Sequence, residues 1–221
     1  PPTAPPPTAP PHPSTLPSDV AVDPAGFEFD VQPIDDATRQ LMQGASIRIG
    51  CPVPFDQLRL VRVTHWDFDG ELQTGELVVD QSVTGELEKV FTTLHRERFP
   101  IRRMRLVDHY GPADDPADGA DDFASIEDDN TSAFNCRART GSDEWSQHSF
   151  GTAIDVNPIE NPYVSAAGRT SHPASVTYLD RDDVRPGMAV ADGPLVRAFA
   201  DVGWTWGGTW SDVNDLQHFS K

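Results

Sequence analysis

The chain has 221 residues, of which 35 are acidic and 17 are basic, and its formal net charge is −18 at pH 7. This length suits one sizeable domain and is short for two. The negative charge argues against nucleic-acid binding, because phosphate contacts require a basic surface that releases counterions. No run of about 18 apolar residues is present, so the sequence predicts no transmembrane segment.

The first part of the chain, residues 1–20, is rich in proline mixed with alanine, threonine and serine. Such a stretch buries little apolar surface and favours extended polyproline conformations. We therefore expect residues 1–20 to form a disordered tether and residues 21–221 to form a single domain. The tether is either a plain disordered end or a spacer that holds the domain away from a membrane. Because the chain starts without methionine, we expect a processed product that has lost a signal peptide or carried a lipid anchor.

The first predicted elements follow this tether. Proline and aspartate interrupt residues 21–57, so we expect this stretch to wrap around the domain, with one short helix at 35–44. Residues 58–66 are β-branched and alternate in polarity, which predicts a strand. Residues 76–80 predict a second short strand, and we expect the two strands to pair.

Residues 81–98 carry the clearest helical pattern. Leu87, Val90, Phe91 and Leu94 fall on one stripe at helical spacing. Asp80 or Ser82 can cap the start of this helix, and Pro100 prevents its continuation.

The remaining elements are shorter. Residues 101–107 alternate as a strand, residues 131–137 predict a strand or an extended segment, and residues 157–187 predict a long loop. Residues 194–203 predict a short helix with proline near its start and glycine after its end. Strands and helices mix without regular alternation. This pattern favours the α+β class, with a small antiparallel sheet and flanking helices, over a doubly wound parallel sheet.

The segment SQHSFGTAID, residues 146–155, indicates a polar site beside the core. Ile154 and Val156 flank Asp155, so in an extended segment the apolar pair faces one way and the carboxylate the other. His148 reaches the same point if the chain turns at Gly151.

A second polar pair lies near the C-terminus, where Asp215 precedes His218 by three residues. Together with His148 and Asp155 it supplies two imidazoles and two carboxylates. A hydrolytic zinc site takes three protein ligands, keeps a position for water and has a carboxylate nearby that accepts the proton of this water. The residue set matches that requirement.

The motifs resemble those of a known family. Ser146, His148, Gly151, Ala153 and Asp155 complete a Ser-x-His-x-x-Gly-x-Ala-x-Asp pattern, and the matching stretches are NTSAFNCR, WSQHSFGTAIDVNPIENPY and GWTWGGTWSDVNDLQHF. From about residue 47 to residue 220, the sequence resembles the zinc peptidases of the D-alanyl-D-alanine carboxypeptidase family of VanY type, which includes L-alanyl-D-glutamate endopeptidases. The resemblance implies a Hedgehog/DD-peptidase-like fold.

The resemblance also implies roles for individual residues. Carried over by motif, the zinc ligands are His148, Asp155 and His218, and the general base is Asp215. An arginine upstream of the first ligand would hold the substrate carbonyl or a carboxylate; we expect Arg137, with Arg139 as the rival.

Two further residues are expected at the substrate. Ser146 would give substrate a hydroxyl hydrogen bond. Trp206 would line the cleft, although an aromatic residue in such a run also serves for packing.

We therefore expect a zinc-dependent peptidase that hydrolyses peptidoglycan stem peptides, with D-alanyl-D-alanine carboxypeptidase as the first hypothesis. The alternatives are an L-alanyl-D-glutamate endopeptidase and a metal-bearing cell-wall binding module without activity. We expect a monomer that is secreted or associated with the bacterial cell envelope. Export would favour a disulfide between Cys51 and Cys136 over two buried thiols, and this bridge would hold Arg137 in place.

Overall fold

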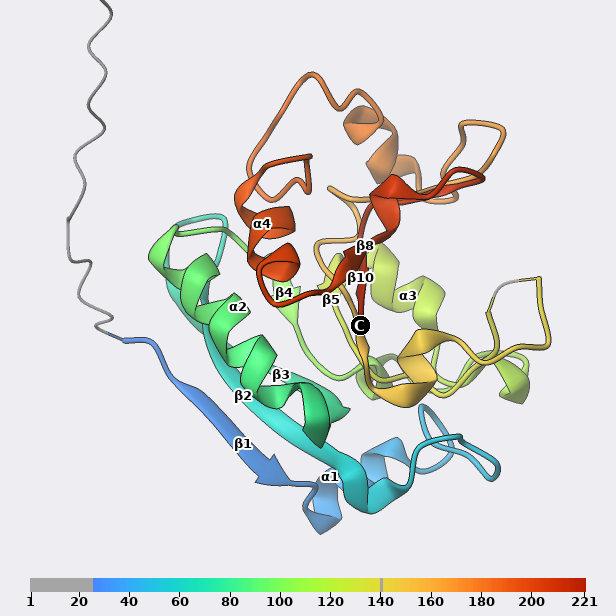
Figure 1. Ribbon diagram of the computed structural model, residues 1–221. Helices are drawn as coiled ribbons and strands as arrows, with labels where there is room; N and C mark the ends of the chain where they lie inside the picture. Colours follow the sequence, from blue (N-terminus) through green and yellow to red (C-terminus); the bar gives the residue numbers. More distant parts are fainter. Residues whose placement is uncertain (1–25, 140) are drawn as a thin grey trace, which may run out of the picture.

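The computed structural model describes residues 26–139 and 141–221 (Figure 1). The expected tether lies outside these residues. The helices are α1 (Asp36–Met42), α2 (Thr84–Arg96), α3 (Asp122–Glu127) and α4 (Pro194–Ala200). The strands are β1 (Phe29–Pro33), β2 (Leu58–Trp66), β3 (Leu72–Asp80), β4 (Arg103–Met104), β5 (Asn130–Thr131), β6 (Ala153–Asp155), β7 (Tyr163–Val164), β8 (Thr205–Trp206), β9 (Asn214–Asp215) and β10 (His218–Ser220).

The larger sheet has the strand order β1-β2-β3 and is antiparallel throughout. The strand predicted at 58–66 is β2, and the one predicted at 76–80 is the second half of β3. Their register pairs Leu58 with Asp80, so the two strands pair as expected. The stretch expected only to wrap around the domain also contributes a strand, because β1 pairs with the other edge of β2.

Helix α2 covers one face of this sheet, with α4 beside it (Figure 1). The residues of its predicted apolar stripe are all buried, namely Leu87, Val90, Phe91 and Leu94. Asp80 accepts a hydrogen bond from the backbone N–H of Ser82, and this capped turn leads into α2. The helix ends before Pro100, as the sequence predicts.

Strand β2 packs against two apolar clusters, one on each face. Val61 and Val63 belong to the cluster under α2 and α4, whereas Leu58 and Leu60 belong to a second cluster that includes Cys136. This alternation follows from the two-residue period of a strand. Because both faces of β2 are buried, the larger sheet packs tightly against the segments that carry the polar motifs.

The smaller antiparallel sheet has the order β6-β10-β8 and carries two of the polar motif residues. A two-stranded antiparallel pair, β7-β9, and a short parallel pair, β4-β5, complete the strands of the described residues. Of the strand predicted at 101–107, only the two residues of β4 are a strand. A 3-10 helix, η3 (Val107–Tyr110), begins at the end of the predicted range. The mixed α+β class with small antiparallel sheets and few helices is confirmed.

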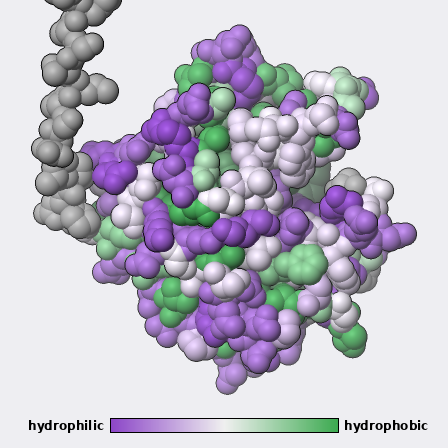
Figure 2. All heavy atoms as spheres, in the orientation of Figure 1, coloured by the Kyte–Doolittle hydropathy of each residue, from purple (hydrophilic) through white to green (hydrophobic). Residues whose placement is uncertain are grey.

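The surface of the described residues is mainly hydrophilic in the view of Figure 2, where apolar groups form small separate patches. None of the described helices has the length and apolar character needed to cross a bilayer.

Candidate metal centre

Pairing of β6 with β10 brings two motif residues together from distant parts of the chain. The antiparallel register places His218 directly opposite Asp155. Ile154 and Phe219, which are the next pair in the register, are both fully buried and anchor the two strands in the core. The apolar neighbours therefore hold the backbone while the polar side chains face the site.

His148 reaches the same point through a tight turn. It lies in the 3-10 helix η5 (Gln147–Phe150), which ends at Gly151 in the left-handed region with φ of +68°. The carbonyl of Gly151 accepts a hydrogen bond from the backbone N–H of Asp80 at 2.9 Å. A Cβ at Gly151 would lie 2.6 Å from that nitrogen, so both the dihedral angle and the close approach require glycine.

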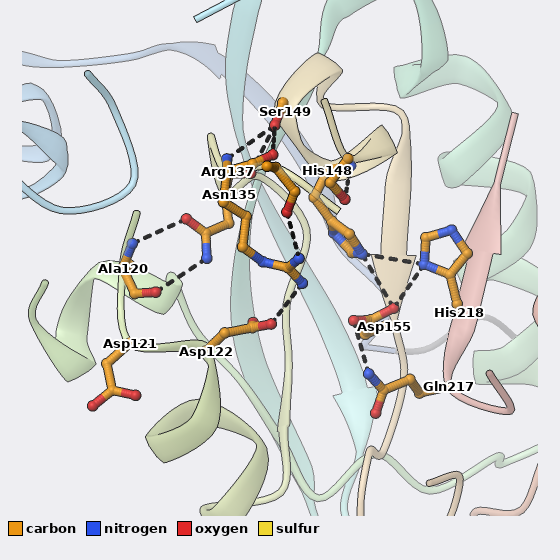
Figure 3. A network of polar contacts seen from close by, with 12 residues as sticks. Ala120, Asp121, Asp122, Asn135, Arg137, His148, Ser149, Asp155, Gln217 and His218 are labelled. Carbon is orange, nitrogen blue, oxygen red and sulfur yellow. Dashed lines mark hydrogen bonds and ion pairs between the residues drawn. The ribbon is translucent and has the colours of Figure 1, made fainter. Parts of the chain in front are cut away.

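The side chains of His148, Asp155 and His218 converge on one point (Figure 3). His148 Nε2 lies 3.2 Å from Asp155 Oδ1 and 3.2 Å from His218 Nδ1, and His218 Nδ1 lies 3.0 Å from Asp155 Oδ1. All three residues are buried, with exposed fractions of 4–6%. Around zinc with bond lengths of about 2.0–2.1 Å, the edge of a tetrahedron is about 3.3 Å. The spacing of these three atoms is close to that edge.

Hydrogen bonds outside the group leave lone pairs directed into it. His148 Nδ1 donates to the carbonyl of Ala133 at 2.5 Å, so in the neutral ring its Nε2 carries a lone pair. Gln217 Nε2 donates to Asp155 Oδ2 at 3.0 Å, which leaves Oδ1 for the shared point. Such outer partners orient the ligands of a metal. The residues present therefore fit a divalent ion such as zinc.

In the group of His148, Asp155 and His218, the carboxylate and the histidines shift one another's pKa. Burial alone would raise the pKa of Asp155, but the neighbouring histidines His148 and His218 outweigh it and the pKa is lowered. Burial alone would lower the pKa of His148, but the carboxylate of Asp155 outweighs it and the pKa is raised. Asp155 is thus held as a carboxylate, which is the form that binds a metal.

Asp215 lies at the end of β9, opposite Tyr163 of β7. The residue is partly exposed, but its Oδ1 is buried and has no hydrogen-bond partner among the described residues. Burial, followed by the charge of Asp155, raises the pKa of Asp215 well above its ordinary value. A buried carboxylate oxygen without a partner is available to accept a proton at this point.

Gly207 makes room for Asp215. A Cβ at Gly207 would lie 2.5 Å from the backbone oxygen of Asp215. The glycine in the aromatic stretch therefore lets β9 pass close to the 3-10 helix η7 (Gly207–Thr209).

The two candidate arginines have different surroundings. Arg137 is mostly buried and forms an ion pair with Asp122 at 2.6 Å. The carboxylates of Asp155 and Asp215 also contribute to raising its pKa, after Asp122. Arg139 is exposed at 58% of its side chain and pairs with Glu144. These surroundings favour Arg137 as the arginine of the site.

Ser146 and Trp206 have structural contacts of their own. Ser146 Oγ accepts a hydrogen bond from the backbone N–H of His148 at 3.3 Å and caps η5. Trp206 Nε1 donates to the carbonyl of Leu216 at 2.8 Å, and its ring stacks on Phe219. The contacts of Trp206 are those of a packing residue, and its contact with substrate stays a prediction.

The sequence interpretation overlooked Trp210, which lies in the same aromatic stretch as Trp206. Its ring centroid is 5.4 Å from that of His218, and 42% of its surface is exposed. Trp210 is therefore an exposed aromatic residue beside the metal group. Three residues, which form η7, lie between the two tryptophans, and this turn directs their rings differently.

Cys51 and Cys136 form a disulfide, as expected, with Cα atoms 5.9 Å apart and a sequence separation of 85 residues. The bridge joins the loop after α1 to the residue that directly precedes Arg137. It lies beside the second apolar cluster.

Two imidazoles and one carboxylate form a ligand set that catalytic zinc sites use. The donor set and the fold together therefore indicate a zinc site of the catalytic type. Residues 140–221 match the model of a family described as D-alanyl-D-alanine carboxypeptidase. This part of the chain is a domain of that family, which confirms the resemblance and the Hedgehog/DD-peptidase-like fold. The comparisons with curated proteins and with solved structures found no match.

The matched range contains His148, Asp155, Asp215 and His218. Arg137 and both cysteines of the disulfide lie before this range, so their roles depend on the geometry described above. The match is also shorter than the range from about residue 47 to residue 220 over which the sequence resembles the family.

Proposed function

We propose that this chain is a zinc-dependent peptidase that hydrolyses peptidoglycan stem peptides, and that it acts as a D-alanyl-D-alanine carboxypeptidase. One observation carries the proposal: three buried lone-pair donors, His148 Nε2, Asp155 Oδ1 and His218 Nδ1, converge near a carboxylate, Asp215, that has a buried oxygen without a partner. The family match over residues 140–221 supports the class of substrate.

Each residue has a distinct task in this proposal. His148, Asp155 and His218 hold the zinc, which when bound supplies a Lewis acid for the scissile carbonyl and lowers the pKa of a water. Asp215 Oδ1 accepts the proton of the attacking water and returns it to the leaving amine. Arg137 donates hydrogen bonds to the substrate, where fixed positive charge stabilises developing negative charge.

Two residues complete the proposed contacts with the stem peptide. Ser146 Oγ accepts a bond from the backbone but keeps its own hydroxyl proton, which it can donate to substrate. The exposed ring of Trp210 beside His218 offers an apolar wall at the mouth of the site. We assign the cleft contact to Trp210 in preference to Trp206, because Trp206 is engaged in packing.

The proposed place of action is outside the cytoplasm. A disulfide between Cys51 and Cys136 supports this location, because such bonds persist in oxidising compartments. We propose that residues 21–221 act as one domain, as a monomer, at the end of the proline-rich tether 1–20. The proposed substrate, the peptidoglycan of the cell wall, also lies outside the cytoplasm.

The test is mass spectrometry of defined muropeptides with tri-, tetra- and pentapeptide stems, incubated with the zinc-loaded protein and with Asp215→Ala. Loss of one terminal alanine from the pentapeptide, absent with the variant, is the expected result. Separation of L-Ala from the rest of the stem would replace the carboxypeptidase by an endopeptidase. Binding of zinc without cleavage of any stem would replace the enzyme by a cell-wall binding module.

A further inference from the structure

Three successive residues, Asn135, Cys136 and Arg137, are each bonded to another segment, the first and third to residues at the start of α3 and the second to the loop after α1. Asn135 Oδ1 accepts from the backbone N–H of Ala120 at 3.0 Å, and its Nδ2 donates to the carbonyl of the same residue at 3.2 Å. Cys136 is bonded to Cys51, and Arg137 Nη2 lies 2.6 Å from Asp122 Oδ2. The segment that leads to the candidate metal centre is therefore held at three points.

Asp122 and its neighbour Asp121 divide two tasks at the start of α3. Asp121 Oδ1 accepts from the backbone N–H of Ala124 at 2.9 Å and caps the helix. The helix therefore does not need the carboxylate of Asp122 for its cap. Asp122 instead turns toward Arg137, and Figure 3 shows the two side chains meeting on the side of Arg137 away from His218.

The guanidinium of Arg137 is only partly satisfied by the protein. Nη2 donates to Asp122 and Nη1 donates to the carbonyl of Ala138 at 3.2 Å. Nε is buried and has no hydrogen-bond partner among the described residues. A buried N–H donor without a partner is costly, and a ligand that accepts from it removes this cost.

We propose that Asp122 is a positioning residue for the reaction. By holding Nη2, it fixes the planar guanidinium of Arg137 so that its remaining N–H groups are directed to a carbonyl or carboxylate of the stem peptide. An arginine that is held in this way loses less conformational freedom when substrate binds. This inference rests on the proposed function, because the stem peptide is the ligand that Arg137 would hold.

The experiment compares Asp122→Asn, Asp122→Glu and the adjacent control Asp121→Asn in kinetics with the pentapeptide stem. Asp122→Asn should lower kcat/KM by about 10–100-fold, a loss of the size seen when a partner that orients a metal ligand is removed. Asp122→Glu should retain more activity than Asp122→Asn, because it restores the charge. Asp121→Asn removes the same charge and keeps a good helix cap, so it should stay within about twofold of the wild type. Zinc stoichiometry should be unchanged in all three variants. The melting temperature should fall in Asp122→Asn, which leaves a mostly buried guanidinium without its ion-pair partner, and should be unchanged in Asp121→Asn.

A double-mutant cycle separates positioning from general support of the fold. In the Arg137→Ala background, Asp122→Asn should change kcat/KM by less than about twofold, because its partner is already absent. A full additional loss in that background would overturn the inference. Equal losses in Asp121→Asn and Asp122→Asn would overturn it as well.

A second readout does not depend on activity. The ¹⁵N-edited NMR resonance of Arg137 Nε–H, assigned by its loss in Arg137→Lys, should be protected from exchange in the wild type and in Asp121→Asn but not in Asp122→Asn. If the Arg137 Nε–H stays protected from exchange in Asp122→Asn, this would contradict the positioning of Arg137 by Asp122. If the wild type cleaves no stem peptide, the proposed enzymatic function fails, while this resonance still reports whether Asp122 holds Arg137.

Discussion

His218 lies directly opposite Asp155 across the antiparallel pair β10-β6, and its Nδ1 is 3.0 Å from the carboxylate Oδ1. The two residues are 63 positions apart in the sequence. Their meeting depends on strand register, since a shift by one residue would turn one of the side chains to the other face of the sheet. Buried Ile154 and Phe219 fix that register, so the core directly determines the geometry of the candidate site.

Replacing Asp155 with alanine should remove the metal. The variant loses the only carboxylate of the three-residue group and leaves two neutral imidazoles, so no ligand in the group offsets the positive charge of the metal. Its zinc affinity should fall by more than the about 10–100-fold that loss of an outer partner causes. Metal analysis after dialysis against a weak chelator measures this loss, and full metal content together with full activity would refute the assignment.

Replacing Asp215 with asparagine should separate catalysis from metal binding. Asp215 is outside the three-residue group, so zinc stoichiometry should stay at the wild-type value. Loss of a general base typically lowers the rate by about 10²–10⁴-fold, and kcat should fall within that range. Loss of metal in parallel with activity would mean that Asp215 acts as a ligand and not as the base.

Removing the disulfide should destabilise the protein and slow the reaction. The bridge closes a separation of 85 residues, for which the chain-entropy model gives about 4.6 kcal/mol. Urea unfolding of the Cys51→Ser/Cys136→Ser double variant should show a loss up to this size. Because Cys136 precedes Arg137, kcat should also fall in the variant. A catalytic rate unchanged by removal or reduction of the bridge would disprove its role in holding Arg137.

Stability should fall as pH rises between about 4.5 and 8 because of Glu160. Burial, and then the neighbouring carboxyl of Asp129, raise the pKa of Glu160 from 4.5 to about 8. The folded state therefore keeps a proton that the unfolded state releases above about pH 4.5, so a rise in pH favours unfolding across this window. Glu160→Gln should flatten that part of the curve of unfolding free energy against pH. An identical slope in the variant would contradict the assignment.

Gly207→Ala should disturb the site without touching a polar group. The added Cβ would lie 2.5 Å from the backbone oxygen of Asp215, and such overpacking usually costs about 1–3 kcal/mol. The strand that carries Asp215 must shift, so both stability and kcat should fall. Gly85→Ala is the matched control, because its Cβ would enter open space on α2 and should leave both unchanged or improve stability. Equal behaviour of the two variants would show that Gly207 is not required by close approach.

Local patterns predicted much of the fold. The bounds of β2 and the apolar stripe of α2 follow from periods of two and 3.6 residues, which act within one element. The turn at Gly151 was also visible, because glycine between His148 and an alternating segment favours a sharp bend. Strand β1 was missed because Pro33 and nearby aspartates weaken its pattern, and its hydrogen bonds with β2 stabilise it.

The sequence predicted the metal ligands of the site but not the contacts that surround them. His148, Asp155 and His218 belong to motifs, so the family resemblance brought them together. The pairing of Arg137 with Asp122 depends on how α3 packs, and no local pattern encodes it. Likewise, the exposure of Trp210 and the partial burial of Trp206 depend on the turn between them.

X-ray absorption spectroscopy at the zinc edge, on protein loaded with one equivalent of zinc, tests the central claim most directly. We predict a shell of nitrogen and oxygen donors at about 2.0–2.2 Å, with the scattering of two imidazoles and no sulfur, because the ligands are His148, Asp155 and His218. The His218→Ala variant should lose one imidazole contribution. A protein that binds no zinc, or a spectrum that is unchanged in this variant, would contradict the account.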